Sequence, residues 1–362
     1  MKKLLFVVTG VGLGDSTRIH AIIDAIKHKH PDTKFLIACY GTSYNYFKNK
    51  YPVMKISGYR IPGEKMKFKF WGFIFKNYFL PLVWIFIAIK LRYKVKKFAP
   101  DLIISDFEPT GITIAKFAKK KCVTIFGFDP RTFAKFKREH KVSKLMKLQA
   151  SYIQRLYNAS DYVVIPSFIK HVLKAGNYFY VEPIVRKLPE QLPNENKIME
   201  ELKLSRRPIL VMLGGSDFGI TLAKNIVQVA SKFNELFIIF GGSMKLPETE
   251  NVRHIRYTND FLKYLKIAKA VITLAGHNTL CEALVYKKPM LIYPIKQHVE
   301  QQLNAFALKG LALLGTNITP VQILQDLNSL LDNAEKLERK LIKLNFKGGG
   351  ADQVVWFIEG LS

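Results

Sequence analysis

The chain is poor in cysteine and has no internal repeats. Its three cysteines, Cys39, Cys122 and Cys281, stand alone, so neither the paired spacing of a metal site nor a disulfide framework is present. Isolated cysteines of this kind favour a reducing, cytoplasmic setting. No tandem repeat or low-complexity tract interrupts the 362 residues, which argues against a repeat architecture.

Acidic residues are also few: 28 Asp and Glu stand against 56 Lys and Arg, a formal net charge of +28. Residues 1–186 hold 34 basic and 11 acidic residues, a balance of +23, and the remainder holds 22 and 17, a balance of +5. A field of this sign attracts acidic lipid, nucleic acid or a phosphorylated substrate. A solvated lysine-rich surface is the alternative. Nucleic acid is the less favoured partner because no groove-reading or base-stacking motif accompanies the charge.

Two common nucleotide-binding fingerprints are missing. Gly10 and Gly12 open a glycine-rich loop, but Asp15 stands where the dinucleotide fingerprint needs a third glycine. The next expected strand ends at Cys39 rather than at an acidic ribose ligand. A second loop, residues 213–219, lacks the Gly-Lys-Ser/Thr of a Walker motif. An NAD-binding or P-loop function is therefore disfavoured.

The sequence does contain short apolar runs that alternate with helical patterns, and its length suits two domains. Two successive series of this kind predict two doubly wound α/β domains. The segment 182–208, rich in Pro, Glu, Asn and Lys, is the expected connection between them. The expected strands are 4–9, 35–39, 102–105, 123–128 and 162–166 in the first series, and 209–213, 236–240, 271–274 and 290–293 in the second.

Two helices matter for the domain organisation. Isoleucines at helical spacing predict a helix over 17–28, with Asp15 or Ser16 as its N-cap. A last helix is expected over about 351–361. We predict an N-terminal domain over 1–186, a C-terminal domain over 187–345, and a terminal segment, 346–362, that packs back on the N-terminal domain.

Residues 70–89 are apolar and aromatic enough to span a bilayer, but Lys76, Asn77 and Pro81 interrupt them. Cations flank the run on both sides, which is more typical of an interfacial element. The segment 65–97 is therefore predicted to dock on a membrane. A buried helix, an oligomer interface or true insertion are the alternatives.

Three glycine-containing loops follow expected strands and open helices. They contain Gly10, Gly12 and Gly14; Gly214, Gly215 and Ser216; and Gly276, His277, Asn278 and Thr279. A helix N-terminus with free amides favours an anion such as phosphate. The plainer interpretation of the third loop is a capped helix, because Glu282 has the spacing of a capping-box partner to Thr279.

Together these loops resemble those of GT-B glycosyltransferases. The run from Gly276 to Ala305, with Lys288-Pro289 and Tyr293-Pro294 within it, resembles the donor-binding stretch of MurG-like and UDP-glycosyltransferase families. The run 209–216 matches the MurG-like phosphate loop in kind and order, and 105–109 resembles archaeal and bacterial MurG-like glycosyltransferases. The resemblance implies two Rossmann-like domains facing a cleft, with the acceptor bound by the first and a nucleotide-sugar, UDP-linked by preference, by the second.

The resemblance implies a role for each position of this sequence that matches the donor site of these families. Glu282 would bind the ribose hydroxyls, and Glu300 and Gln301 the sugar hydroxyls. The base would lie against Tyr257 and Thr258. The diphosphate would lie against Gly276, Asn278 and Thr279, with Gly214, Gly215 and Ser216 nearby, and His277 would donate to a phosphate or cap the helix.

The sequence departs from the family at one position, because Asp15 stands where such families usually place a histidine. We expect inverting displacement without a metal or cofactor, in which a carboxylate deprotonates the acceptor hydroxyl. The candidates are Asp15, Asp106 and Glu108. A lipid-linked acceptor on the cytoplasmic face of the membrane would fit the basic first half. The alternatives are a sugar-nucleotide 2-epimerase of the same fold, a non-catalytic nucleotide-sugar binder and a nucleic-acid-binding protein.

Overall fold

The computed structural model describes residues 2–59, 63–64, 67–68, 70–168, 173–214, 219–241 and 246–361. The chain forms two compact units. Unit 1 contains residues 1–62, 69–186 and 348–362, and unit 2 contains residues 63–68 and 187–347.

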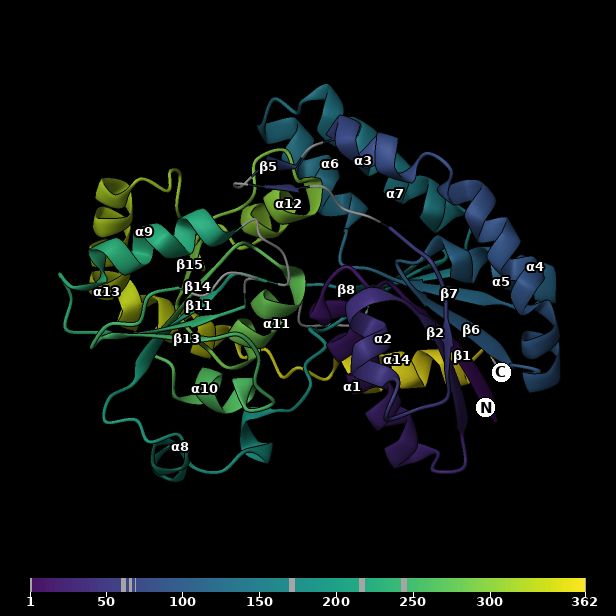
Figure 1. Ribbon diagram of the computed structural model, residues 1–362, viewed down its shortest axis with the longest axis horizontal. Coiled ribbons are helices and arrows are strands. Elements are labelled where there is room, and N and C mark those ends of the chain that lie inside the picture. The colour runs from purple at the N-terminus through teal and green to yellow at the C-terminus, as the bar shows by residue number, and fades with distance from the viewer. Residues whose placement is uncertain are drawn as a thin grey trace. The chain divides into compact units, whose positions relative to one another are not determined.

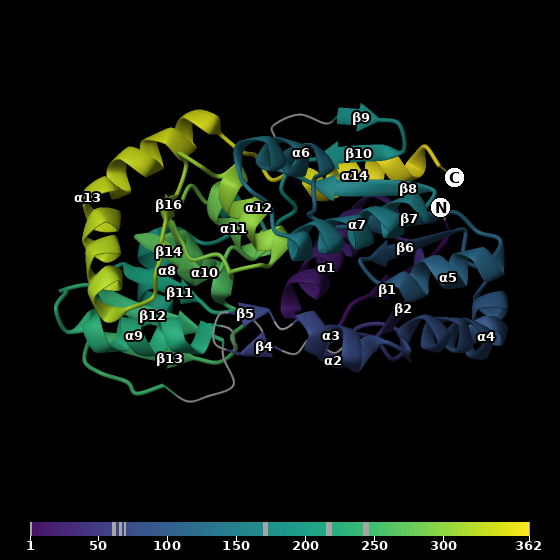
Figure 2. The ribbon, with the colours of Figure 1, turned by 90° about the horizontal axis from the view of Figure 1, so that it is seen from above.

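Unit 1 is an eight-stranded sheet with helices on both faces (Figures 1 and 2). In the described part of unit 1, neighbouring strands are parallel except for the edge strand β9, which is antiparallel to β10. Its strands are β1 (Lys3–Val8), β2 (Lys34–Cys39), β3 (Val53–Lys55), β6 (Leu102–Asp106), β7 (Cys122–Ile125), β8 (Tyr162–Pro166), β9 (Leu173–Ala175) and β10 (Tyr178–Val181). Its helices are α1 (Leu13–Lys29), α2 (Gly41–Phe47), α3 (Phe70–Asn77), α4 (Leu80–Phe98), α5 (Pro109–Ala118), α6 (Pro130–Glu139), α7 (Lys144–Asn158) and α14 (Gly350–Glu359).

The strand order in unit 1 is β3-β2-β1-β6-β7-β8-β10-β9. The chain runs outward from β1 in one direction and then restarts at β6 on its other side. The topological switch point therefore lies between β1 and β6, where Val8 is in register with Asp106. In open α/β sheets, ligands bind at the carboxyl ends of the strands at such a point.

The alternation of side chains along β1 builds two cores in unit 1. Leu4, Phe6 and Val8 belong to the core that contains residues of α1 and α14. Leu5 and Val7 belong to the opposite core, with residues of α4 and α5. The chain's last helix, α14, thus packs within unit 1, and Figure 1 shows it (yellow) beside α1.

Unit 2 is a second parallel sheet, in the order β13-β12-β11-β14-β15-β16. Its switch point lies between β11 and β14, whose loops are the second and third glycine-containing loops of the sequence. Its strands are β11 (Pro208–Met212), β12 (Leu236–Phe240), β13 (Val252–Ile255), β14 (Ala270–Thr273), β15 (Met290–Ile292) and β16 (Leu313–Leu314), with the separate pair β4 (Gly63–Glu64) and β5 (Lys67–Phe68). Its helices are η1 (Pro189–Gln191), α8 (Glu195–Glu201), α9 (Ile220–Ala230), α10 (Phe261–Ile267), α11 (His277–Val285), α12 (Val299–Ala307) and α13 (Pro320–Leu344).

The two doubly wound sheets confirm the predicted fold class, and all nine predicted strands are present with ends within three residues of those expected. The N-cap prediction for the first helix was wrong. Helix α1 begins at Leu13, and Gly12 is its cap residue. The side chain of Asp15 instead bonds to Arg18, and the hydroxyl of Ser16 bonds to Ser43. The connection 182–208 contains η1 and α8, which the sequence analysis missed.

The apolar segment 70–89 forms parts of two helices, α3 and α4, which meet near Tyr78 and Phe79. One face of α4, with Ile87, Leu91 and Val95, is buried in the unit 1 core. Among the residues that the structure describes, none of the helices is long and apolar enough to cross a membrane.

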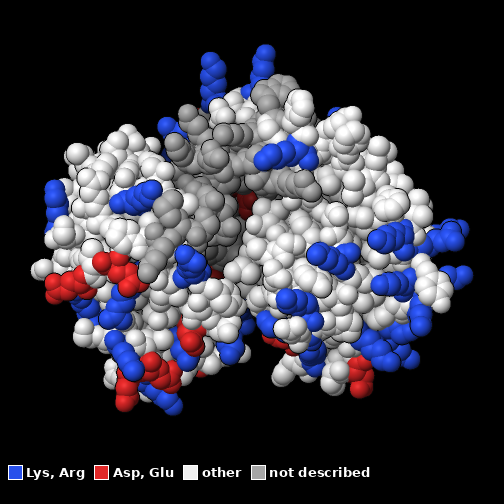
Figure 3. Space-filling model, viewed as in Figure 1, with Lys and Arg blue, Asp and Glu red and all other residues white. Residues whose placement is uncertain are grey.

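Charge differs between the surfaces of the two units. The face of unit 1 seen in Figure 3 (right) carries many Lys and Arg side chains and few acidic ones. The face of unit 2 (left) carries both signs. This agrees with the uneven charge balance of the sequence.

Candidate functional site

The loop after β1 is held by the loop after β2. The backbone of Gly10 lies so close to Tyr40 that an added Cβ would be 1.9 Å from the Tyr40 carbonyl oxygen. The hydroxyl of Thr42 donates to the carbonyl oxygens of Gly10 and Gly12, both at 2.9 Å. The close approach of the two loops therefore explains why glycine, which has no side chain, stands at position 10. A Cβ on Gly12 would meet none of the described residues within 4 Å, so these leave room beside this part of the loop. Gly14 lies within α1.

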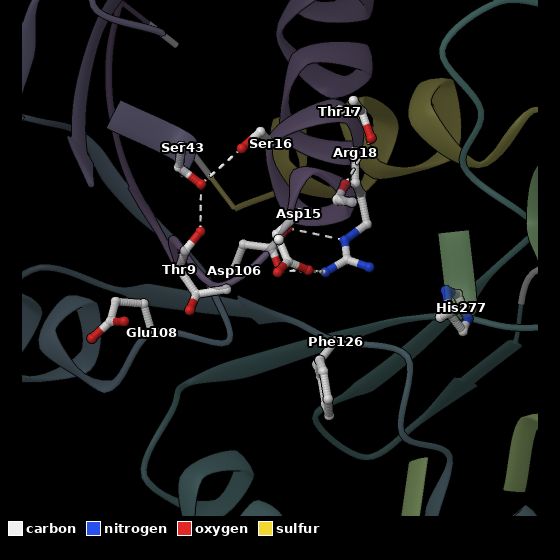
Figure 4. A network of polar contacts seen from close by, with 12 residues as sticks. Thr9, Asp15, Ser16, Thr17, Arg18, Ser43, Asp106, Glu108, Phe126 and His277 are labelled. Carbon is white, nitrogen blue, oxygen red and sulfur yellow. Dashed lines mark hydrogen bonds and ion pairs between the residues drawn. The ribbon is translucent and has the colours of Figure 1, made fainter. Parts of the chain in front are cut away.

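At the switch point of unit 1, two of the candidate carboxylates share one guanidinium (Figure 4). Arg18 Nε donates to Asp106 Oδ2 at 3.0 Å, and Arg18 Nη2 donates to Asp106 Oδ1. The same Nη2 donates to Asp15 Oδ1 at 2.7 Å. The side chains of Arg18 and Asp106 are 2% and 0% exposed, whereas that of Asp15 is 23% exposed. Asp15 is thus the member of this group that a ligand could reach.

Burial and the shared cation act in opposite directions on these carboxylates. Desolvation raises the pKa of Asp15, and the Arg18 guanidinium partly offsets this effect. Burial also raises the pKa of Asp106, to about 7, with the Asp15 charge adding to the rise and Arg18 opposing it. A carboxylate with a raised pKa is a stronger base, so the environment suits proton removal.

The third candidate, Glu108, is buried and caps α5. Its Oε1 accepts from the hydroxyl of Thr110 at 2.8 Å and from the Thr110 amide at 3.4 Å. Burial raises its pKa to about 7. Its neighbour Phe107 has a φ of +45°, an uncommon conformation for a bulky residue, and stacks on Phe126 with ring centroids 3.8 Å apart. Since Glu108 is 1% exposed, the arrangement favours a capping role over contact with an acceptor.

In unit 2, Gly214 lies in the loop after β11 and has a φ of +72°, which favours glycine. None of the described residues would lie within 4 Å of a Cβ added there. The Gly214 carbonyl oxygen lies close to Gly241, where an added Cβ would be 2.6 Å from it. Gly215 and Ser216, which the sequence analysis assigned to the diphosphate, lie outside the described residues.

The loop after β14 is strained, and buried side chains hold it. Ala275 has a φ of +66°, and the buried Asn304 donates its Nδ2 to the Ala275 carbonyl oxygen at 3.0 Å. Gly276 follows as the cap residue of α11 and has no side-chain cap bond. A Cβ added to Gly276 would have no neighbour within 4 Å in the part of the chain that the structure describes. The N-terminus of α11 thus lies at the switch point of unit 2, and a helix N-terminus is a place where anions bind.

The predicted capping box was wrong, because α11 begins at His277 rather than near Thr279. His277 is buried, with the Sγ of Cys281 3.6 Å from its Nδ1. Asn278 and Thr279 are half-buried in the first turn, and Glu282 lies buried one turn further along. This places Asn278 and Thr279 at the helix terminus where phosphate-binding groups are expected.

Helix α12 carries the predicted sugar ligands Glu300 and Gln301, both half-buried. The Oε1 of Gln301 accepts from the Ile295 amide at 3.0 Å, which fixes this side chain against the preceding loop. His298 caps the helix through a ring nitrogen that accepts from the Gln301 amide, and burial lowers its pKa to about 4. A neutral imidazole can accept this bond, so the low pKa suits the cap.

Tyr257 and Thr258 follow β13 rather than ending it, since that strand stops at Ile255. The Tyr257 side chain is exposed, and its hydroxyl donates to Asn259 at 2.8 Å. The Thr258 hydroxyl accepts from the Asp260 amide at 3.0 Å. The contacts of both side chains are therefore local to this loop.

The sequence analysis missed Arg18 and the structural role of Asn304. The signal for Arg18 was its i,i+3 spacing from Asp15, which places both on one face of α1. Asn304 was part of the run 300–305 but gave no sign that it would hold Ala275, because their contact depends on the packing of α12 against the loop.

Proteins with sequences similar to this chain are glycosyltransferases by name. The chain is 23% identical over 97% of its length to an uncharacterized glycosyltransferase of Methanosarcina acetivorans, 95% of which is covered. It is 27% identical over 54% of its length to the UDP-N-acetylglucosamine--N-acetylmuramyl-(pentapeptide) pyrophosphoryl-undecaprenol N-acetylglucosamine transferase of Clostridium tetani, covering 58% of that protein.

The fold matches those of solved glycosyltransferases. Acinetobacter baumannii MurG superimposes with a TM-score of 0.63 at 14% identity, covering 99% of this chain and 100% of that one. The glycosyltransferase of kitacinnamycin superimposes with a TM-score of 0.68 at 13% identity, covering 99% and 98%. Residues 2–332 match the family model described as glycosyl transferase family 1. The chain therefore belongs to this family and is a MurG-like glycosyltransferase with the GT-B fold.

Proposed function

We propose that the enzyme transfers a sugar, with inversion and without a metal ion, from a UDP-sugar to the hydroxyl of a lipid-linked acceptor. Asp15 takes the proton of the acceptor hydroxyl, and the hydroxyl oxygen forms a bond to the anomeric carbon. The bond from that carbon to the diphosphate oxygen breaks, and its electron pair leaves with UDP. A single displacement of this kind inverts the anomeric configuration.

The observation that carries the proposal is the position of Asp15. It lies at the switch point of unit 1, where ligands of α/β sheets bind, and its side chain is partly exposed. Asp106 and Glu108, the other candidates, are buried and bonded to neighbouring side chains. Asp15 is therefore the one candidate carboxylate that combines a raised pKa with a partly exposed side chain.

The donor half of the proposal rests on unit 2. Gly214 and Gly276 lie in the two loops at its switch point, and the N-terminus of α11 provides amides for a diphosphate. These amides and the helix dipole stabilise the leaving group as its charge develops, which supports transfer without a metal ion. The buried Glu282 is the proposed ribose ligand. The preference for UDP follows the relative from Clostridium tetani, whose name specifies a UDP-linked donor.

A lipid-linked acceptor is supported by the surface of α3 and α4. Eight large apolar side chains are exposed there: Phe75, Tyr78, Phe79, Leu82, Ile85, Phe86, Ile89 and Tyr93. Phe75 is 87% exposed and Phe86 is 65% exposed. Exposed lysines and an arginine are interspersed with them, including Lys76, Lys90 and Arg92. Aromatic residues mixed with cations bind the interface of an anionic bilayer. We therefore place the enzyme peripherally on the cytoplasmic face of the membrane.

The test is nucleotide release from a panel of nucleotide-sugars, with and without a membrane lipid extract. We expect release from UDP-sugars that depends on the extract, and an inverted anomeric configuration in the product. Conversion of the sugar without any acceptor would indicate an epimerase instead. Absence of turnover with every donor and extract would overturn the proposal.

Membrane docking has its own test, co-sedimentation with vesicles of neutral and anionic lipid. Changing Leu82 and Phe86 together to Ser removes two exposed apolar side chains, and we expect binding to anionic vesicles to weaken at least about tenfold. Val321→Ser, which alters an exposed apolar residue on α13, is the control and should bind normally. Equal binding by all three proteins would refute a docking role for this surface.

A further inference from the structure

We propose that Arg18 and Asp106 are positioning residues that together set the orientation and the charge state of Asp15. The group Asp15, Arg18 and Asp106 is called the carboxylate–arginine triad below. The inference rests on the proposed function in one respect, the role of Asp15 as the base.

The hydrogen bonds of the triad fix its geometry. The Nε–H and one Nη2–H of Arg18 hold both oxygens of Asp106, and the second Nη2–H is directed at Asp15. A planar guanidinium bound at two points has little freedom to rotate. Asp106 lies at the end of β6, so the sheet sets the place of Arg18, and Arg18 sets the place of the Asp15 carboxylate (Figure 4).

The charges of the triad do not balance when all its members are ionised. Two carboxylates share one guanidinium, so the group carries one net negative charge inside unit 1. Burial and the Asp15 charge raise the pKa of Asp106 to about 7, and the Arg18 guanidinium opposes the rise at both carboxyl groups. Asp106 is therefore the member that can hold the excess proton, which leaves Asp15 ionised. This is the property that a base facing the acceptor needs.

The charged groups around Asp15 affect it in opposite ways. The Arg18 guanidinium favours its ionised form, and the like charge of Asp106 disfavours it. Two further contacts at the start of α1 come from uncharged groups: Ser16 bonds to Ser43 at 2.7 Å, and Thr17 donates to the Gly14 carbonyl at 2.8 Å. The positive end of the α1 dipole adds to the effect of Arg18.

A purely structural role would tie α1 to β6 without controlling proton uptake. The two roles differ in what charge-neutralising variants do to the pH profile of kcat/KM. Asp106→Asn removes the like charge, so we expect the acidic limb to move to lower pH by about one unit. Arg18→Gln removes the cation, so we expect the same limb to move to higher pH by about one unit. Arg18→Lys keeps the charge but loses the planar fork, so its limb should stay near that of the wild type while the rate falls.

The same variants are followed by NMR titration of selectively labelled aspartate carboxyl carbons, which requires no turnover. The Asp15 signal is assigned by its loss in Asp15→Asn. Opposite shifts of the Asp15 pKa in Asp106→Asn and Arg18→Gln support the proposal even if no transfer activity is found, which would refute only the proposed function. Unmoved titrations, or shifts in the same direction, would overturn it. UDP binding by each variant checks that the protein is folded, and if Arg18→Gln does not fold, the Asp106→Asn and Arg18→Lys pair decides.

Discussion

Among the described residues, the switch point of unit 1 gathers charged side chains, whereas that of unit 2 presents glycine backbone and the N-terminus of a helix. In unit 1, Asp15, Arg18 and Asp106 meet between β1 and β6. In unit 2, Gly214 lies in the loop after β11, and Gly276 is the cap residue of α11 in the loop after β14. The same topology therefore carries different groups at its two switch points.

In the reaction we propose, this difference matches what each substrate needs. A hydroxyl must lose a proton to react, and only a titratable side chain can take it. A diphosphate is already charged and is best met by amides and a helix dipole that need no proton. Burying a carboxylate costs free energy because its charged form is removed from water. Backbone amides carry no net charge and do not have this cost. We therefore expect proton transfer to depend on unit 1 and donor binding to depend on unit 2.

The largest effect is expected from Asp15→Asn, which removes the proposed base and keeps its shape. We expect the rate of transfer to fall by about 10²–10⁴-fold. The measurement is single-turnover transfer with saturating donor. Asp32→Asn, at an exposed aspartate of unit 1, should keep the wild-type rate. A wild-type rate for Asp15→Asn would remove the chemical role assigned to unit 1.

The next effect concerns Glu108, whose buried carboxyl group should make the free energy of unfolding depend on pH. Burial raises the pKa of Glu108 from 4.5 to about 7, so the folded state binds this proton more tightly than the unfolded state. The stabilisation is fully present below about pH 4.5 and is lost as the pH rises through 7. Glu108→Gln should lack this decline, so the wild type should lose about 2–3 kcal/mol more than the variant in unfolding free energy between pH 4.5 and 7.5.

Denaturant unfolding at several pH values measures this difference. Glu139→Gln, at an exposed glutamate, should follow the wild type. Parallel curves for the wild type and Glu108→Gln would mean that the carboxyl group is not desolvated as its burial indicates.

A smaller effect is expected in unit 2 from Asn304→Ala, which deletes the buried bond to the strained Ala275. Loss of this bond leaves a buried carbonyl oxygen without its partner and should cost about 1–3 kcal/mol of unfolding free energy. Asn333→Ala removes an exposed side-chain bond to the Ser329 carbonyl and should cost less than about 0.5 kcal/mol. Similar costs for the two variants, by urea unfolding, would show that the loop does not depend on Asn304.

The smallest expected effect is that of a metal chelator. Because helix termini and amides stabilise the leaving group in our proposal, excess EDTA should change the transfer rate by less than about twofold. Loss of activity that Mg²⁺ or Mn²⁺ restores would show that amides alone do not suffice in unit 2.

The sequence predicted the two sheets because buried parallel strands read as short apolar runs, and β8 and β12 were predicted with the bounds they have. Helix starts were less predictable. Glycine was the cap residue of both α1 and α11, so the polar residues that follow were mistaken for caps. The pattern also could not show that Arg18 joins Asp15 to Asp106, 88 residues away, because strand order alone brings β1 beside β6.

The most direct test of the division between the two units is calorimetric titration of UDP into three proteins: the wild type, Asp15→Asn and Glu282→Ala. We expect Asp15→Asn to bind UDP like the wild type and Glu282→Ala to bind it about 10- to 100-fold more weakly, since a hydrogen bond to a charged group is lost. Glu335→Gln, at an exposed glutamate of α13, is the matched control. No binding of UDP by the wild type, or equal weakening in Asp15→Asn and Glu282→Ala, would contradict the assignment of donor binding to unit 2 and of proton transfer to unit 1.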